Sequence, residues 1–315
     1  MKEGCIEGLE SVPTAARTCV LTIGNFDGVH LGHQRIVRMA RALGRPAGLP
    51  VVAMTFDPPP DLVLRPDDAP QRVVPAAIKC HLLRQAGCDW VVTARPDRAM
   101  LSLSPEQFVH EVIVRRLSPR HLVEGPNFHF GAQRAGNVQV LRQFGAAAGF
   151  DVHLAEPVRL ELDGRDAVIS STLIRQLVAA GRVDEARRCL GRDFTLYGRV
   201  VPGRGIGRGL DYPTANLSLT EQVCPGDGVY AGRATLDGGE FLAAISVGTQ
   251  PTFSDGADGP RTVEAFLLAA GGDFYGQEMV LTFVERLRPQ RRYDSPEGLK
   301  AQMAKDVERV RQICG

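Results

Sequence analysis

The first 190 residues alternate short apolar runs with helical patterns, and this alternation constrains the fold more than any other feature of the chain. The helical patterns include Gly32–Leu43 and Val138–Ala148, where apolar residues recur every three or four positions. Such alternation predicts a parallel sheet covered by helices on both faces, whose ligands bind beyond the carboxyl ends of the strands. The predicted buried strands are Cys19–Ile23, Val51–Phe56, Trp90–Thr93, His121–Glu124 and Val152–Ala155.

Beyond Gly191 the sequence pattern changes. Short apolar segments typical of strands are separated by glycine and proline turns, with no helical pattern between them. This pattern predicts an antiparallel barrel or sandwich, with strands at Phe194–Val201, Gly228–Ala234, Phe241–Val247, Thr262–Leu268 and Met279–Val284. Asp294-Ser295-Pro296 then predicts the start of a terminal helix with an apolar stripe. We therefore expect an α/β domain over residues 1–190 and a β domain over residues 191–315.

Charge and cysteine usage narrow the class of partner. The 37 Lys and Arg residues nearly balance 36 Asp and Glu residues, so no global field draws the chain to nucleic acid or to an anionic membrane. A local basic pocket for a phosphorylated small molecule stays open. The seven cysteines form no C-x-x-C pair, and no run of 18 apolar residues exists. We expect reduced thiols and a cytoplasmic protein; the oligomeric state is left open.

The densest chemical signal lies between the first predicted strand and the first predicted helix. It reads Gly24-Asn25-Phe26-Asp27-Gly28-Val29-His30-Leu31-Gly32-His33. Glycines let the backbone approach a ligand, and a helix N-terminus offers free N–H groups to an anion. His30 and His33 lie three residues apart and can donate to phosphate oxygens. The alternative is a tight turn with two polar surface histidines, but the whole pattern favours a nucleotide site.

Two further segments are ambiguous by themselves. Ser170-Ser171-Thr172-Leu173-Ile174-Arg175 is either an ordinary helix cap or a site for a triphosphate, with Arg175 as the cation. Gly125–Gly131, which contains Asn127, follows the fourth predicted strand at the expected ligand edge. No P-loop motif is present, and Gly203–Gly209 does not match the dinucleotide fingerprint.

Taken together, these segments resemble the bifunctional bacterial riboflavin kinase/FAD synthetase family over nearly the whole chain. Gly24–His33 matches the family's G-x-F-D-G-x-H-x-G-H motif, and Asn127–Arg134 and Ser170–Arg175 match two more. The second half matches at Gly203–Asn216 and at Val263-Glu264. The resemblance implies a Rossmann-like nucleotidylyltransferase sheet followed by a riboflavin kinase β-barrel with a terminal helix.

For the first domain, the resemblance implies an FMN adenylyltransferase. His30 and His33 would hold the ATP phosphates, and Asn127 would lie near the flavin phosphate or the adenylyl group. The β,γ-phosphates, which leave as pyrophosphate, would be held by Ser171, Thr172 and Arg175. The nucleotide-binding loop would further include Gly24, Phe26, Asp27, Gly28 and Gly32. Positioning and charge neutralisation would suffice for direct attack of FMN on the α-phosphorus of ATP.

For the second domain, the resemblance implies a riboflavin kinase. Thr214 and Asn216 would engage Mg²⁺ and the ATP phosphates, because Mg²⁺ prefers hard oxygen ligands. Glu264 would be the base for the riboflavin 5′-hydroxyl. We also predict that Arg288 and Tyr293 bind the flavin. The remaining nucleotide-binding residues would be Gly203, Gly207 and Arg208.

The sequence departs from the family pattern at a few positions, which keeps alternatives open. Pro59 replaces a histidine of T-F-D-P-H-P, Asp211 replaces a glycine before the P-T-A-N segment, and Phe266 replaces a common histidine. The main hypothesis is a bifunctional enzyme that phosphorylates riboflavin to FMN and then adenylylates FMN to FAD. One alternative retains only one of the two activities. Another is a non-catalytic regulator that binds flavin or nucleotide.

Overall fold

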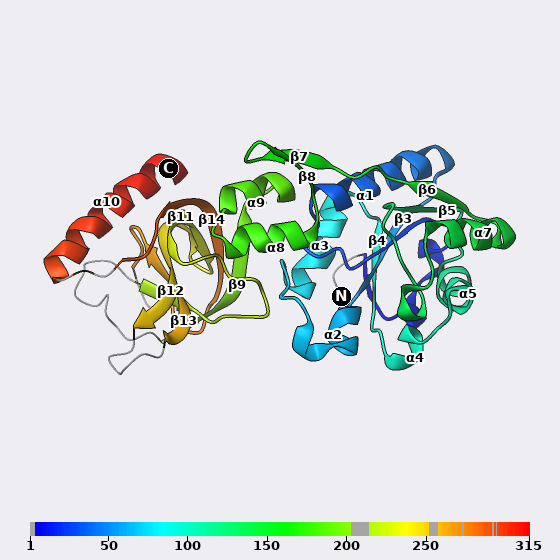
Figure 1. Ribbon diagram of the computed structural model, residues 1–315, viewed down its shortest axis with the longest axis horizontal. Helices are drawn as coiled ribbons and strands as arrows, with labels where there is room; N and C mark the ends of the chain where they lie inside the picture. The colour runs from blue at the N-terminus through cyan, green and yellow to red at the C-terminus, as the bar shows by residue number, and fades with distance from the viewer. Residues whose placement is uncertain (1–3, 203–213, 252–257, 272–273, 292, 294) are drawn as a thin grey trace. The chain divides into compact units, whose positions relative to one another are not determined.

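The computed structural model describes residues 4–202, 214–251, 258–271, 274–291, 293 and 295–315. The chain forms two compact units, which Figure 1 labels element by element. Unit 1 comprises Met1–Pro70 and Ala76–Ser170, and unit 2 comprises Gln71–Pro75 and Ser171–Gly315.

Unit 1 is built on a six-stranded sheet in the order β1-β4-β3-β2-β5-β6, with every neighbouring pair parallel. The predicted parallel sheet is therefore confirmed, and a two-stranded hairpin, β7-β8, and the edge strand β1 are additions. The strands are β1 (Cys5–Glu7), β2 (Val20–Ile23), β3 (Val51–Phe56), β4 (Trp90–Ala94), β5 (His121–Glu124), β6 (Asp151–Leu154), β7 (Arg159–Leu162) and β8 (Arg165–Val168). The helical segments are η1 (Leu9–Ser11), η2 (Thr14–Ala16), α1 (Leu31–Gly44), η3 (Arg45–Ala47), α2 (Pro60–Leu64), η4 (Pro66–Asp68), α3 (Ala76–Ala86), α4 (Arg98–Leu101), α5 (Pro105–Gln107), η5 (Phe108–Val114), α6 (Arg115–Leu117), η6 (Ala132–Arg134) and α7 (Val138–Ala148).

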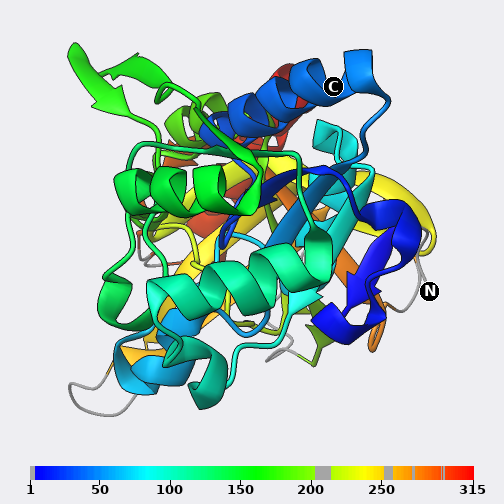
Figure 2. The same cartoon turned by 90° about the vertical axis from the view of Figure 1, so that its right-hand side faces the viewer.

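Apolar side chains cover both faces of this sheet, as parallel strands require. Helices α1 and α3 contribute Val37 and Leu83 to the core on one face. Segment η5 and helix α7 contribute Ile113 and Leu141 to the core on the other face. Figure 2 shows α1, in blue, and the η5 segment, in teal, on opposite sides of the strands. The sheet's carboxyl edge is thus the side left for ligand-binding loops.

One sequence prediction is wrong in this unit. Cys5 and Cys80 form a disulfide, although we expected only reduced thiols. Pairing of β1 with β4 places Cys5 against the same core cluster that contains Cys80. A sequence separation of 75 residues hides that proximity. Cys19, Cys88, Cys189, Cys224 and Cys314 are free and buried.

Unit 2 contains a closed six-stranded barrel in the order β10-β13-β12-β11-β14-β9, with every described pair antiparallel. This confirms the predicted antiparallel barrel. The elements are α8 (Ser171–Ala179), α9 (Val183–Leu190), β9 (Phe194–Val201), β10 (Thr214–Leu217), β11 (Gly228–Leu236), β12 (Gly239–Pro251), β13 (Asp258–Leu267), β14 (Glu278–Arg288) and α10 (Pro296–Cys314).

Helix α10 begins where the sequence predicted. The Ser295 hydroxyl accepts a hydrogen bond from the Gly298 N–H at 3.1 Å, which caps the helix; Asp294 lies outside the described residues. Val307 and Val310 of α10 pack against Ala231 and Phe266 of the barrel wall. The helix therefore covers part of the outer face of the barrel. Among the described residues, the helices all fall short of the length or apolar character needed to cross a bilayer.

Candidate active sites

The loop after β2 is held in an unusual backbone shape. Phe26, Gly28 and Val29 have φ angles of 46°, 80° and 39°, a region that favours glycine and costs energy for the other two. The chain then enters α1 with His30 as the N-cap residue, and the His30 Nδ1 atom accepts from the His33 N–H at 3.4 Å. The loop thus presents the start of α1 at the carboxyl edge of the sheet, where an anion is favoured.

The two histidines of this loop, three residues apart, lie against each other. Their ring centroids are 3.6 Å apart and nearly parallel, and the Phe26 ring meets His33 edge-on at 5.2 Å. Burial, followed by the charges of His30 and Lys79, holds the pKa of His33 well below its usual range. Within the described part of the chain, the His33 Nδ1 atom is buried and has no hydrogen-bond partner. A neutral imidazole with an unused polar atom is suited to a polar ligand.

Sequence reasoning missed Lys79, on α3. Its ammonium is buried and donates to the carbonyl oxygens of Asn25 at 3.1 Å and Phe56 at 3.0 Å. The Thr55 hydroxyl also donates to the Asn25 oxygen, at 3.2 Å. Lys79 therefore ties the loop after β2 to the carboxyl end of β3. The available signal was its place one helical turn before the buried Leu83, on the apolar face of α3.

The other predicted residues of the first domain lie in two places. Asn127 is exposed in the loop after β5, and its carbonyl contacts the His129 ring at 2.9 Å. Ser171 opens helix α8, and Arg175 donates to the Thr172 hydroxyl at 3.4 Å, one turn apart. Because α8 belongs to unit 2, its association with His30 stays a prediction.

A row of side chains crosses the outer wall of the barrel. The strand register pairs Asn216 with Glu264, Glu264 with Ser246, Ser246 with Val229, and Val229 with Arg288. Directly paired residues share a face of an antiparallel sheet, so all five side chains lie on one side. Helix α10 covers that side, and a cavity of about 170 Å³ remains between the helix and the wall.

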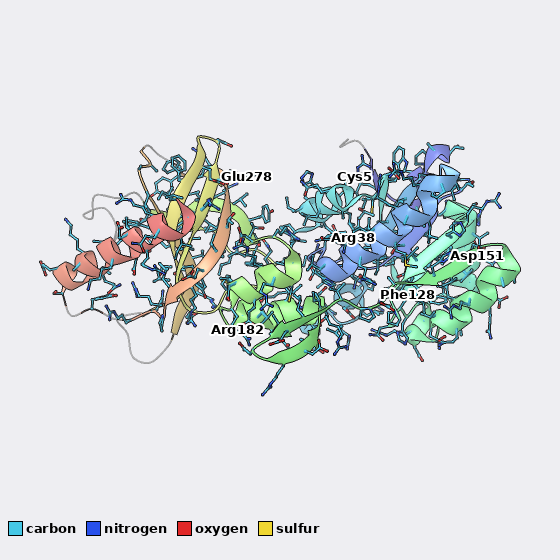
Figure 3. The ribbon with its side chains drawn as sticks, turned by 90° about the horizontal axis from the view of Figure 1, so that it is seen from above. Cys5, Arg38, Phe128, Asp151, Arg182 and Glu278 are labelled. Carbon is cyan, nitrogen blue, oxygen red and sulfur yellow. A yellow bond between two sulfur atoms is a disulfide. The ribbon has the colours of Figure 1, made fainter. Side chains whose placement is uncertain are left out.

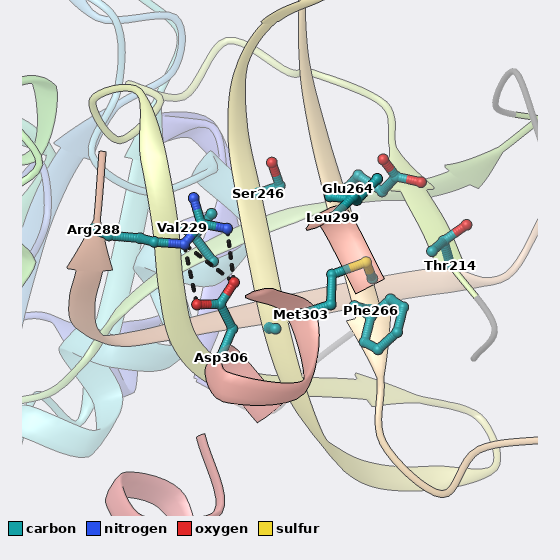
Figure 4. A pocket seen from close by; sticks show the side chains of 10 residues that line it. Thr214, Val229, Ser246, Glu264, Phe266, Arg288, Leu299, Met303 and Asp306 are labelled. Atoms are coloured by element: carbon teal, nitrogen blue, oxygen red, sulfur yellow. Dashed lines mark hydrogen bonds and ion pairs between the residues drawn. The ribbon is translucent and has the colours of Figure 1, made fainter. Parts of the chain in front are cut away.

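Figure 4 shows Glu264 and Thr214 together at one end of this cavity and Arg288 with Asp306 at the other. Thr214 and Glu264 come from adjacent strands and form a hydrogen bond. Burial raises the pKa of Glu264, and the bond from Thr214 opposes the shift. Phe266 and Met303 supply an apolar floor beside them. The arrangement offers a carboxylate of increased basicity next to a surface that fits an apolar ring.

Arg288 lines the same cavity, but its guanidinium is engaged. It binds the buried Asp306 of α10 through two nitrogens, at 2.7 and 3.0 Å, which Figure 4 marks with dashed lines. The Tyr293 ring centroid lies 5.9 Å from the guanidinium carbon. The pair fixes α10 over the cavity. The predicted residues Gly203, Gly207 and Arg208, and the departure at Asp211, lie outside the described residues.

The two units have the features of a two-module transferase that uses ATP. A parallel sheet carries a histidine-bearing loop at a helix N-terminus, where phosphates are stabilised. A separate barrel carries a half-buried carboxylate beside a hydroxyl, which suits removal of a proton from an alcohol.

Comparisons with known proteins identify the family. The FAD synthetase family model matches residues 12–173, and the riboflavin kinase family model matches residues 190–314. The bifunctional riboflavin kinase/FMN adenylyltransferase of Pseudomonas fluorescens is 36% identical over 315 residues, covering 98% of this chain and 97% of its own. That of Escherichia coli (strain K12) is 35% identical over 312 residues, with the same coverage. The chain belongs to this bifunctional family.

The fold comparison agrees over the whole chain. A crystal structure described as a macrolide-efflux protein from Streptococcus pneumoniae has a TM-score of 0.86 and 29% identity, covering 98% of this chain and 99% of that one.

The two family matches and the bifunctional relatives show the activity. The protein is an enzyme with both activities, riboflavin kinase and FMN adenylyltransferase, acting on riboflavin, FMN and ATP. The family matches support neither the single-activity alternative nor the non-catalytic regulator.

Proposed function

We propose that the barrel cavity is the riboflavin phosphorylation site and that Glu264 is its general base. The observation that carries the proposal is the half-buried Glu264 carboxylate, which lines the cavity beside Thr214 and has a raised pKa. The riboflavin 5′-hydroxyl would lose its proton to Glu264 as its oxygen bonds to the γ-phosphorus of ATP. The bond from that phosphorus to the β,γ-bridging oxygen breaks, which yields FMN and ADP.

Thr214 and Asn216 would hold Mg²⁺ at this site. Both lie on β10, two residues apart, and share the face on which Asn216 is paired with Glu264. A hydroxyl, an amide oxygen and a carboxylate are hard donors, so the residues fit the ion. Bound there, Mg²⁺ supplies positive charge to the ATP phosphates. Gly203, Gly207 and Arg208 would complete the nucleotide site, and Arg288 and Tyr293 would contact the flavin.

In the first domain, His30 and His33 would hold the ATP phosphates at the start of α1. His33 has an unused, buried Nδ1 atom, which supports this role. The FMN phosphate would attack the α-phosphorus, with pyrophosphate as the leaving group, while Asn127 holds the flavin phosphate. Ser171, Thr172 and Arg175 would hold the departing β,γ-phosphates, and Gly24, Phe26, Asp27, Gly28 and Gly32 would shape the loop.

The proposed base is tested by Glu264→Gln, with Glu278→Gln as its matched control. Glu278 is an exposed glutamate at the start of β14 in the same barrel. Riboflavin, ATP and Mg²⁺ are supplied, and the flavins are separated by chromatography. Because a general base contributes about 10²–10⁴-fold, FMN formation should fall by that factor in Glu264→Gln only.

A second measurement distinguishes a lost base from a damaged protein. FAD formation from supplied FMN should remain at the wild-type rate in Glu264→Gln, because the adenylyltransferase residues lie elsewhere. Riboflavin phosphorylation within a few fold of wild type would contradict the assignment of Glu264. Loss of both activities would show that the substitution damages the fold.

We assign residues 1–190 to the adenylyltransferase domain and 191–315 to the kinase domain. The start of the riboflavin kinase match at residue 190 supports this boundary. We propose that the enzyme acts in the cytoplasm, on small molecules rather than on nucleic acid or a membrane. The near-zero net charge of +1 supports this choice of partners.

A further inference from the structure

We propose that His121, Asp151 and His153 form a binding site for a divalent transition metal such as Zn²⁺. His121 is the first residue of β5, and Asp151 and His153 are the first and third residues of β6. His121 and Asp151 begin their strands, whereas the predicted ATP site follows the carboxyl end of β2. Figure 3 labels Asp151 on this part of unit 1.

The spacing of the donor atoms fits a tetrahedral ion. The His121 Nδ1 atom lies 3.3 Å from the His153 Nε2 atom and 3.6 Å from an Asp151 carboxylate oxygen. All three donor atoms lie within 4.8 Å of one another. Two ligands that bind tetrahedral zinc at about 2.0–2.1 Å lie roughly 3.4 Å apart. The two separations from His121 match this spacing, and a side-chain rotation of the exposed Asp151 adjusts the third.

The parallel register holds the three side chains together. His121 is paired with Asp151 in the register, and His153 follows Asp151 by two positions. The period of two in a strand places all three side chains on the same face of the sheet. Imidazole and carboxylate together are typical zinc ligands, and two imidazoles favour zinc, cobalt or nickel over magnesium.

Hydrogen bonds alone cannot give all three groups a favourable partner, whereas a bound ion can. The His121 Nδ1 atom is the shared atom of both short contacts, and it carries at most one proton. If Nδ1 donates to both neighbours, the single proton is shared between two acceptors, and each bond is weaker than a full one. If it accepts from His153, the Asp151 carboxylate meets a lone pair. A cation is attracted by all three atoms at once, and it would fasten the edge strand β6 to β5.

The test titrates metal-free, full-length protein with Co²⁺ in the absence of ATP and Mg²⁺. Binding is followed through the visible absorption of Co²⁺, and Zn²⁺ is then added as a competitor. We expect one Co²⁺ per chain, displaced by Zn²⁺. Loss of a single outer partner of a metal ligand weakens affinity by about 10–100-fold, so His121→Asn and His153→Asn should each weaken it at least that much.

Two further variants make the result specific. Asp151 is exposed, with 77% of its side chain accessible, so Asp151→Asn removes the carboxylate charge without disturbing the core and should also weaken Co²⁺ binding. His110 is an exposed histidine of η5, so His110→Asn should bind Co²⁺ as the wild type does. Zn²⁺ should raise the Tm of the wild type and of His110→Asn only. Absence of saturable binding, or equal binding by wild type, His153→Asn and Asp151→Asn, would overturn the proposal.

Discussion

Replacing Lys79 with methionine should impair FAD formation while leaving riboflavin phosphorylation intact. The buried ammonium donates to the Asn25 and Phe56 carbonyl oxygens and so connects the loop after β2 to the end of β3 at the sheet's carboxyl edge. Methionine has a similar length and fills the space, but it can donate to neither oxygen. The Asn25 oxygen keeps the bond from Thr55, whereas the Phe56 oxygen loses its charged donor.

The structure sets the size of the effect on stability. A hydrogen bond from a charged donor contributes about 1.5–3 kcal/mol, and one such bond is lost without replacement. Release of a buried ammonium offsets part of this loss, since a buried charge carries a desolvation cost. The free energy of unfolding should therefore fall by at most about 3 kcal/mol, which is roughly 6–12 °C in Tm for a unit of this size. Activity should fall further, by about 10²-fold, because a shift near 1 Å at a reacting centre has that effect.

The assay follows FAD formation from supplied FMN and, separately, FMN formation from riboflavin. Lys305→Met is the control, because Lys305 is exposed on α10 and the chemical change is the same. The control should match the wild type in both reactions. If Lys79→Met forms FAD within twofold of wild type while its Tm falls, the loop link is structural only, and the reasoning is refuted.

Three further outcomes follow from other contacts. Asp306→Ala leaves Arg288 half-buried and unpaired, which should lower the free energy of unfolding by about 2–4 kcal/mol in urea titrations; an unchanged value would contradict a role for the pair in holding α10. Burial raises the pKa of Glu124 well above 4.5, so wild-type stability should fall as the pH rises from there, whereas Glu124→Gln should lose this pH dependence. An equal dependence of unfolding free energy on pH in both proteins would contradict this role of Glu124. Cys5→Ala should lower stability by about 2–4 kcal/mol in non-reducing buffer, and peptide mass mapping should find Cys5 joined to Cys80 in the wild type.

The period of the apolar pattern predicted the fold class of each unit. Val51–Phe56 is apolar at nearly every position, which is typical of a strand buried on both faces, and it became the central strand β3. The capping box at Ser104 and Gln107, which the sequence Ser104-Pro105-Glu106-Gln107 indicates, has both reciprocal hydrogen bonds. Patterns of this kind act within a few residues, so a single sequence displays them.

Contacts between distant segments were not predicted, because they depend on residues that are far apart in the sequence. The Cys5–Cys80 disulfide and the bonds from Lys79 to Asn25 and Phe56 depend on which strands become neighbours. Strand order in a parallel sheet is set by the crossover helices and is not encoded in any short window. Lys79 also appears as one charged residue within a helix, which is usually a solvent-facing position.

Strand β10 shows that attention to a family motif can hide the alternating pattern that predicts a strand. Thr214 and Asn216 are predicted from the family motif to engage Mg²⁺ and the ATP phosphates, and no strand is predicted there, yet Thr214-Ala215-Asn216-Leu217 alternates polar and apolar residues with a period of two. In the structure Ala215 and Leu217 are buried, while Thr214 and Asn216 share the face that carries Glu264. Four residues are short for a strand prediction, and the preceding proline favours a turn. The alternation nevertheless has a chemical consequence: a strand holds its hydroxyl and amide at a fixed spacing beside the base, which a flexible turn would not.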